Sequence, residues 1–226
     1  MTCRREPVVT IDGPAGAGKS TVAKEVARRL GFVLVDTGAL YRAVAWAVAH
    51  AGIPPSDETA VSALLAGIQV SLDGARVLVD GRDVTGEIRS PEISMLTSRL
   101  TALPSVREKM TPIQRQLAAA GGVVLEGRDT GTVVCPDAEV KIYLDADLGE
   151  RARRRQAELE SRGVIASRGE VQAEMALRDR QDSERALAPL RKPDGAITVD
   201  STGVPPETVV QSIVDAVEQA RCCTRS

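Results

Sequence analysis

The chain has very few aromatic residues. Its 226 residues include only four, which are Phe32, Tyr41, Trp46 and Tyr143. Proteins that bind single-stranded nucleic acid stack bases on aromatic side chains, and nucleic-acid-binding domains in general carry a basic surface. The formal net charge here is −2, so no overall positive field attracts DNA or RNA. These two shortages argue against a nucleic-acid partner.

Histidine is almost absent as well, because His50 is the only one in the chain. A single histidine excludes metal sites built from several imidazoles. Ser-His-Asp or Cys-His catalysis would have to depend on His50 alone. That residue lies in the apolar stretch 43–51, which has the composition of a helix face. We therefore expect His50 to be a partly buried helix residue without a catalytic role.

Cysteine is scarce and has no C-x-x-C spacing. The four cysteines are Cys3, Cys135, Cys222 and Cys223, and the last two are adjacent in a polar segment. Free thiols in a reducing cytoplasm account for this pattern. No apolar run approaches the ~20 residues of a membrane span, and no apolar signal segment follows Arg4 and Arg5. We expect a soluble, cytoplasmic protein that does not contact membranes.

The most informative segment is a glycine-rich run at residues 13–21 that fits G-x-x-x-x-G-K-[ST], the phosphate-binding loop. Residues 7–11 before it predict a short buried strand. Residues 20–30 after it predict a helix with one apolar face. A chance glycine turn would lack this order of strand, loop and helix. The run consists of Gly13, Pro14, Ala15, Gly16, Ala17, Gly18, Lys19, Ser20 and Thr21.

Each part of this run has a chemical role toward a phosphate. Glycines let backbone N–H groups converge on an anion, and the N-terminus of the following helix adds partial positive charge. Lys19 would reach the β- and γ-phosphates of a nucleoside triphosphate, and the Ser20 hydroxyl would help to hold Mg²⁺. The sequence thus predicts a site for ATP and Mg²⁺.

The pattern of elements predicts an α/β fold with a parallel five-stranded sheet and helices on both faces. The length of the chain suits one such domain with insertions, or a large and a small domain. Short apolar runs between helical patterns mark the strands at 8–11, 32–35, 123–125, 140–144 and 197–199. Residues 68–85 alternate around Asp-Gly turns and predict an inserted antiparallel meander. Helices are expected at 91–101, 104–120, 147–186 with an interruption near Arg162 and Gly163, and 205–220.

Polar residues follow several predicted strand ends, where ligands of parallel sheets bind. They are the loop at 13–20, Asp36 and Thr37, and the segment from Glu126 to Asp129. We expect these segments to converge. Arg42, one turn into the helix after Asp36, would then face the phosphate site, although a surface arginine is the simpler interpretation. Charged residues after a buried strand either pair with one another or bind a ligand, and the position favours a ligand.

Two clusters of charged residues remain open to both structural and functional interpretations. The arginines at 151 and 153–155 either form a solvated helix face, paired with glutamates at helical spacing, or a mobile flap over polyphosphate. Arg178, Asp182 and Arg185 are spaced i, i+4, i+7 on one helical face. They either make surface salt bridges, worth well under about 1 kcal/mol, or bind an anion and a sugar hydroxyl.

Taken together, four segments resemble the bacterial-type cytidylate kinases, which are P-loop nucleoside monophosphate kinases. The resemblance runs from Val8 to about Ala220. It rests on residues 11–20 (IDGPAGAGKS), 36–42 (DTGALYR), 126–134 (EGRDTGTVV) and 178–190 (RDRQDSERALAPL). The last two segments are specific to this family, whereas the phosphate loop alone is not. The meander at 68–85 matches the enlarged monophosphate-binding domain of this subgroup.

The resemblance implies roles for individual residues. The family residues that bind the CMP phosphate correspond to Arg42, Arg128 and Arg185. Those that read the cytosine base correspond to Ser98, Arg107 and Asp129. Those that bind the ribose correspond to Arg178 and Asp182. Arg151, Arg154 and Arg155 correspond to lid arginines that act on ATP and the transferring phosphoryl group. Thr37 and Glu126 stand where relatives have serine and aspartate. The implied catalytic residues are Lys19, Arg128, Arg154 and Arg185.

The implied activity is transfer of the γ-phosphate of ATP to CMP or dCMP with Mg²⁺, by a monomer. The implied domains are a core at about 1–37, 121–146 and 187–226, a CMP-binding insertion at about 38–120, and a lid region at about 147–186.

A carboxylate such as that of Asp129 can accept a hydrogen bond from the N4 amine of cytosine, which uracil lacks. Three alternatives remain: another acceptor such as UMP, AMP or shikimate, a regulatory or nucleic-acid-coupled NTPase, and a non-catalytic CMP-binding module.

Overall fold

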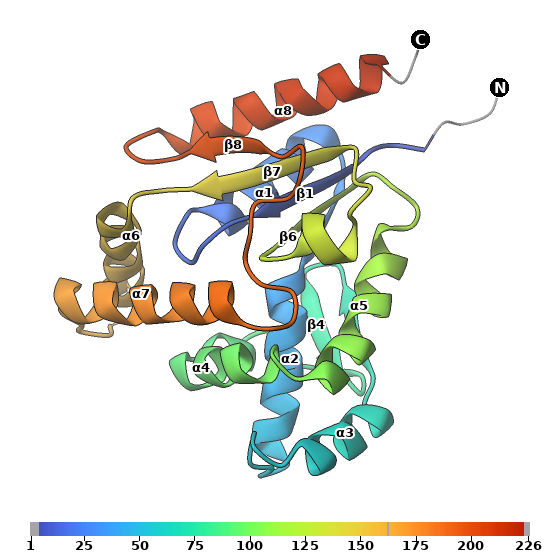
Figure 1. Ribbon diagram of the computed structural model, residues 1–226, viewed down its shortest axis with the longest axis vertical. Coiled ribbons are helices and arrows are strands. Elements are labelled where there is room, and N and C mark those ends of the chain that lie inside the picture. Colours follow the sequence, from blue (N-terminus) through green and yellow to red (C-terminus); the bar gives the residue numbers. More distant parts are fainter. Residues whose placement is uncertain (1–4, 162, 224–226) are drawn as a thin grey trace. The chain divides into compact units, whose positions relative to one another are not determined.

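The computed structural model describes residues 5–161 and 163–223 and divides the chain into two compact units (Figure 1). The phosphate-loop unit comprises Met1–Val35 and Leu117–Ser226, and the inserted unit comprises Asp36–Gln116. Cys3, Arg4 and Arg162 lie outside the described residues.

The phosphate-loop unit is built on a five-stranded sheet in the order β2-β6-β1-β7-β8. β1 pairs in parallel with β6 and β7, and β7 with β8. All five predicted strands are confirmed, and four of them end on an aspartate at the carboxyl edge of the sheet. Their bounds are β1 Val8–Asp12, β2 Val33–Asp36, β6 Val123–Gly127, β7 Val140–Asp145 and β8 Ile197–Asp200.

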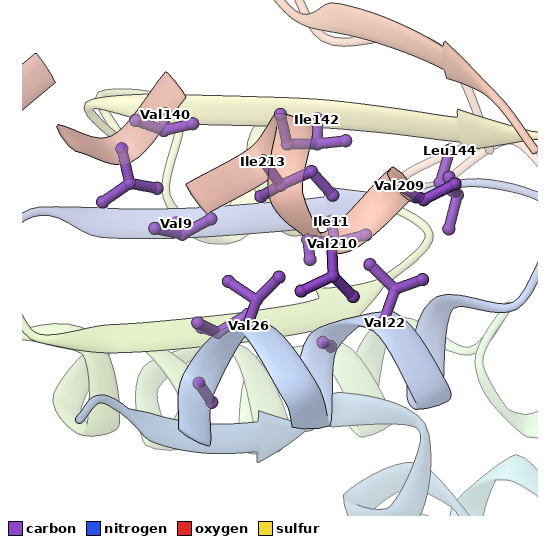
Figure 2. Packing of buried hydrophobic residues seen from close by; sticks show 14 of the residues in the cluster. Val9, Ile11, Val22, Val26, Val140, Ile142, Leu144, Val209, Val210 and Ile213 are labelled. Carbon is purple, nitrogen blue, oxygen red and sulfur yellow. The ribbon is translucent and has the colours of Figure 1, made fainter. Parts of the chain in front are cut away.

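Alternate residues of β1 point to opposite faces of the sheet, and the buried side chains on the two faces differ in polarity. On one face, Val9 and Ile11 join a hydrophobic core with α1 (Lys19–Leu30) and α8 (Pro206–Cys223). Figure 2 shows the valines of α1 and the apolar side chains of α8 meeting the strands on this face. The opposite face of β1 carries Asp12, which contacts the helical turn η2 (Thr130–Val134).

Asp12 holds the segment that follows β6. Its carboxylate accepts hydrogen bonds from the backbone N–H of Thr130 at 2.9 Å, the Thr130 hydroxyl at 2.8 Å and the backbone N–H of Gly131 at 2.7 Å. Burial raises the pKa of the Asp12 carboxyl, although these hydrogen bonds oppose the shift. Asp12 therefore fixes the direction in which the chain leaves β6, where Arg128 and Asp129 lie.

The predicted helical region 147–186 consists of α6 (Leu148–Ser161) and α7 (Arg168–Glu184), which pack against each other (Figure 1). Their shared core includes Leu159, Val171 and Met175, and Ala15 of the loop packs against it. The predicted interruption is present, because α6 ends at Ser161 and Gly163 has a φ of +75°. α7 begins with a capping box between Ser167 and Glu170.

The inserted unit is organised around α2 (Thr37–His50), which packs against helices and strands of the same unit. The predicted meander is an antiparallel sheet of β3 (Val70–Asp73), β4 (Arg76–Val79) and β5 (Arg82–Asp83). The predicted helices at 91–101 and 104–120 are α4 (Pro91–Leu100) and α5 (Pro104–Ala118). The sequence analysis did not predict α3 (Glu58–Gly67) or the short turn η1 (Glu87–Arg89).

Three local expectations were wrong. His50 is the last residue of α2 but is exposed, and its ring stacks on Trp46 at 4.8 Å between centroids. Cys222 and Cys223 do not follow the final helix but end it, because α8 continues beyond the predicted boundary. Arg185 does not share a helical face with Arg178, because α7 stops at Glu184 and Arg185 has an extended backbone with a ψ of 140°.

The free thiols expected at Cys135 and Cys222 are present. Among the described helices, none combines the length and the apolar character that a bilayer crossing requires.

Removal of the Asp12 carboxylate should destabilise the phosphate-loop unit. The variant Asp12→Ala leaves two backbone N–H groups and one hydroxyl without their acceptor in a buried site, which should lower the free energy of unfolding by about 3 kcal/mol. Urea unfolding measures this loss. Asp137→Ala, at an exposed position, is the matched control. Equal stability of the two variants would contradict the anchoring role of Asp12.

Candidate phosphate-binding site

The loop between β1 and α1 has a backbone that only glycine accommodates. Gly13, Gly16 and Gly18 have φ values of +151°, +74° and +92°. A Cβ atom on Gly13 would lie 1.9 Å from the Leu144 carbonyl oxygen, and one on Gly16 would lie 2.6 Å from the Met175 methyl carbon. Gly13 and Gly16 are therefore required by the close approach of the loop to its neighbours, and Gly18 by its left-handed backbone.

The loop leads directly into the N-terminus of α1. Gly18 caps this helix without a side-chain hydrogen bond, and no acidic residue lies in the first turn. An N-terminus of this kind favours an anion, because its first N–H groups lack partners within the helix. Lys19 is 7% exposed, and its Nζ donates to the Pro14 carbonyl at 2.6 Å.

Lys19 lies among other positive charges. Its pKa is lowered well below the ordinary lysine value, first by burial and then by the positive charge of Arg128, with a further contribution from Arg178. Glu126 and Asp12 oppose this shift. Three cations directed toward one loop repel one another, so a polyanion bound there would relieve the repulsion.

Ser20 is the residue predicted to hold Mg²⁺. Its hydroxyl donates to the Glu126 carboxylate at 2.8 Å, so two hard oxygen groups lie side by side at the carboxyl end of β6. The donor chemistry fits Mg²⁺, which binds oxygen, keeps several waters and often takes its remaining ligands from substrate phosphates. Within residues 5–161 and 163–223, no cluster of three or more His, Cys, Asp or Glu side chains could hold a metal ion.

Four predicted substrate residues form an alternating ionic chain. Nε of Arg128 donates to the Asp182 carboxylate at 3.0 Å. The guanidinium of Arg185 lies 3.8 Å from Asp182 and 3.6 Å from Asp129. All four side chains are largely buried. The structure thus brings together residues from the end of β6, from α7 and from the segment after α7, and each arginine faces a carboxylate.

Two of the predicted lid arginines contact the phosphate loop. Arg151 donates to the Ala15 carbonyl at 3.1 Å. Arg154 lies near the Ala17 carbonyl at 3.4 Å and donates to the Ser201 carbonyl at 2.6 Å. Arg155 instead pairs with Glu158 on α6, as helical spacing predicted for this cluster.

A cavity of about 450 Å³ adjoins the N-terminus of α1. Its volume lies within the range of small-molecule sites, which is roughly 300–1,000 Å³. One part of the wall consists of apolar side chains of α1 and of prolines and apolar side chains that follow β8. Charged side chains of α6 form another part. The lining residues are Ala17, Gly18, Thr21, Val22, Glu150, Arg153, Arg154, Ser201, Gly203, Val204, Pro205, Pro206 and Val209.

The inserted unit carries the other predicted substrate residues. Arg42 pairs with Asp36 at 3.3 Å, and Thr37 is the buried first residue of α2. Nε of the buried Arg107 donates to the Thr101 carbonyl at 2.8 Å, and the Arg107 guanidinium lies over the Tyr41 ring at 5.5 Å. Ser98 lies on α4. The predicted convergence of residues 36–37 with the loop stays a prediction.

Three residues that organise the site were not predicted from the sequence. Asp12 anchors the segment after β6, Asp179 pairs with Arg151, and the Ser201 hydroxyl donates to the Ala17 carbonyl at 3.0 Å. Asp12 and Ser201 lie at or just beyond strand ends, so the strand-end rule could have indicated both. Asp179 has no comparable signal, because its partners are distant in the sequence.

Comparison with known proteins agrees with this geometry. The model of the cytidylate kinase family matches residues 9–219. The cytidylate kinase of Geobacter sulfurreducens is 48% identical over 224 residues, which is 96% of this chain and 96% of that protein. The bifunctional pantoate ligase/cytidylate kinase of Synechococcus elongatus is 48% identical over 219 residues, and the match covers 93% of this chain but only 42% of that relative.

A solved structure shares the fold at low sequence identity. The crystal structure of an uncharacterized protein from Eubacterium ventriosum has a TM-score of 0.54 at 12% identity and covers 94% of this chain and 99% of that one. Its similarity concerns the fold alone. The family-model match extends over nearly the entire chain and includes both the phosphate loop and the charged residues around it. The chain therefore belongs to the cytidylate kinase family.

Proposed function

We propose that this protein transfers the γ-phosphoryl group of ATP to CMP or dCMP, giving ADP and CDP or dCDP, in pyrimidine nucleotide metabolism. The observation that carries the proposal is the phosphate loop itself, in which glycines with positive φ lead into the N-terminus of α1 and the buried Lys19 donates to the Pro14 carbonyl. Such a site stabilises the charge that spreads over phosphate oxygens during phosphoryl transfer. Membership of the cytidylate kinase family supports the same reaction.

The donor site would consist of the phosphate loop and the cavity beside it. Residues 13–21 would hold the phosphates of ATP, and the cavity between α1, α6 and the β8–α8 connection would receive the nucleoside. Ser20 would bind Mg²⁺, and Glu126 would orient the Ser20 hydroxyl. When bound, Mg²⁺ neutralises charge on the β- and γ-phosphates.

The family resemblance assigns acceptor-binding roles to residues in each unit. Asp129 would accept from the N4 amine of cytosine, and Ser98 and Arg107 would contact the same base. Arg42, Arg128 and Arg185 would hold the phosphate, while Thr37, Arg178 and Asp182 complete the set. The segment at about 38–120 would then be the CMP-binding insertion, and the region at about 147–186 would be the lid.

The reaction requires no general base. The second pKa of a phosphate monoester is about 6, so an oxygen of the CMP phosphate is already anionic at neutral pH. Lys19, Arg128, Arg154 and Arg185 would orient the two phosphates and neutralise the charge between them. Closure of the lid would exclude water, which would otherwise hydrolyse ATP. We expect a cytoplasmic monomer that acts on free nucleotides rather than on nucleic acid.

The first test of the proposed function measures ADP formation from Mg·ATP with CMP, dCMP, UMP and AMP offered separately. Strong turnover with CMP and dCMP alone supports both the reaction and the cytosine reader. Turnover with another acceptor keeps the kinase and refutes the cytosine site. ADP release that none of the four acceptors changes would assign the protein to the NTPases.

Loss of the Lys19 side chain should abolish phosphoryl transfer without unfolding the protein. Removal of one preorganised cation from the transferring phosphates should lower kcat at least about 100-fold. Steady-state ADP formation measures kcat, and urea unfolding confirms the fold. Lys24→Ala, an exposed position on the same helix, is the control. Full activity of Lys19→Ala would refute the mechanism.

Loss of the Asp129 carboxylate should remove the preference for cytosine. A specific hydrogen bond to a base edge contributes roughly 1–3 kcal/mol of discrimination, so the CMP-to-UMP ratio of kcat/KM should fall roughly 5- to 150-fold in Asp129→Ala. The exposed Asp137→Ala provides the comparison. If selectivity for CMP survives in Asp129→Ala, Asp129 does not read the base.

A further inference from the structure

One residue of the phosphate loop, Ala15, is held through both its N–H and its carbonyl by an ion pair from the two lid helices. The Ala15 N–H donates to the Asp179 carboxylate at 3.4 Å, and the Ala15 carbonyl accepts from Arg151 at 3.1 Å. Arg151 and Asp179 form a close ion pair with each other. Arg151 lies on α6 and Asp179 on α7, so the three residues make a closed ring of hydrogen bonds between loop and lid.

Arg151 is fixed from a further direction. Its Nε donates to the Ala146 carbonyl at 2.9 Å, just beyond the end of β7. Its side chain is only 9% exposed. The guanidinium therefore has three protein acceptors: the end of the sheet, the loop and α7. A guanidinium that is buried and hydrogen-bonded in this way is held in one conformation and can support the loop.

The neighbouring glycine shows how closely the lid helices approach the loop. A Cβ atom on Gly16 would lie 2.6 Å from the Met175 methyl carbon and 3.1 Å from the Arg151 Cβ. Met175 belongs to the hydrophobic cluster between α6 and α7, against which Ala15 packs. The polar ring holds Ala15, and the apolar cluster packs against Ala15 and closely approaches Gly16.

We propose that Arg151 and Asp179 are positioning residues that hold the phosphate loop in its anion-binding conformation, and that Arg151 acts on the loop rather than on the nucleotide. This inference rests on the proposed function and revises the role that the family resemblance implies for Arg151. Arg154 differs, because it contacts the loop from the side of the cavity through Ala17 and Ser201.

The ring predicts where the kinetic effect appears. Its hydrogen bonds join Ala15 to Arg151 and Asp179, and none of these bonds involves Arg128, Asp129 or Arg185. Loss of the ring should therefore weaken the handling of ATP and leave KM for CMP unchanged. A variant that merely destabilises the protein reduces the active fraction, which lowers kcat and leaves both KM values unchanged. The pattern of KM values separates the two possibilities.

The experiment compares the full-length variants Asp179→Ala, Asp179→Asn, Arg151→Ala and the double variant with the unmodified protein. ATP affinity is measured by titration calorimetry without CMP, and KM for ATP and CMP by ADP formation. We expect Asp179→Ala to weaken ATP binding and raise KM for ATP by up to roughly 100-fold, because a displacement of about 1 Å in a positioning group can cost that much. Asp179→Asn keeps an acceptor and should fall between Asp179→Ala and the unmodified protein.

Two matched comparisons sharpen the test. Glu174→Gln changes an exposed acid on the same helix and should leave every parameter unchanged. In the double variant the losses should not add, because Arg151 and Asp179 act through one ring. Additive losses would mean that the two residues act separately, which would overturn the proposal.

The remaining outcomes also decide the question. Unchanged ATP affinity in Asp179→Ala would overturn the proposal, and so would a lower kcat with both KM values unchanged. An unmodified protein that binds ATP but does not phosphorylate CMP would refute the proposed function alone. The calorimetric comparison would then still decide whether the ring positions the loop.

Discussion

The arrangement around the phosphate loop depends on positive charge concentrated where water is largely excluded. Lys19 is buried at the start of α1, and the guanidinium groups of Arg128 and Arg178 act on it. Mutual repulsion and lost hydration make such a cluster costly unless other groups compensate. Many of the ion pairs and hydrogen bonds in the phosphate-loop unit offset this cost.

The compensation comes from carboxylates that each hold one group in place. Glu126 binds the Ser20 hydroxyl, Asp182 binds Arg128, and Asp179 binds Arg151. Side chains held in this way need little reorganisation when an anion arrives, which is how a preorganised site stabilises transferring charge. Asp12 extends the scheme to the backbone, because it holds the segment after β6 through two N–H groups. The acids are therefore as much a part of the site as the cations.

Sequence patterns predicted the sheet well, because β-strands and amphipathic helices leave local periodic signals. The apolar runs at 8–11 and 140–144 were sufficient to locate β1 and β7. α3 was missed, and only Val61 and Leu65 of this short helix are buried. Arg185 was misplaced because helical spacing carries no information on where a helix ends.

The candidate site could be predicted only in part. The loop motif and the strand-end rule singled out Lys19, Ser20, Arg128 and Asp129 from local sequence, and helical spacing singled out Asp182 and Arg185. The family resemblance supplied the roles of the last four toward CMP. The roles of Asp12 and Asp179 depend on contacts across more than one hundred residues, which no local pattern encodes. The same holds for Arg151. Its spatial contacts with Ala146 and Ala15 indicate its role, whereas its position in the arginine cluster of the sequence does not.

The indole of Trp46 gives the inserted unit an optical label of its own. Trp46 is the only tryptophan of the chain, and it lies on α2 in contact with the His50 ring and the Arg82 guanidinium, with its N–H donating to Glu87 at 2.9 Å. Excitation selective for indole therefore reports on this unit alone, while the phosphate-loop unit is silent.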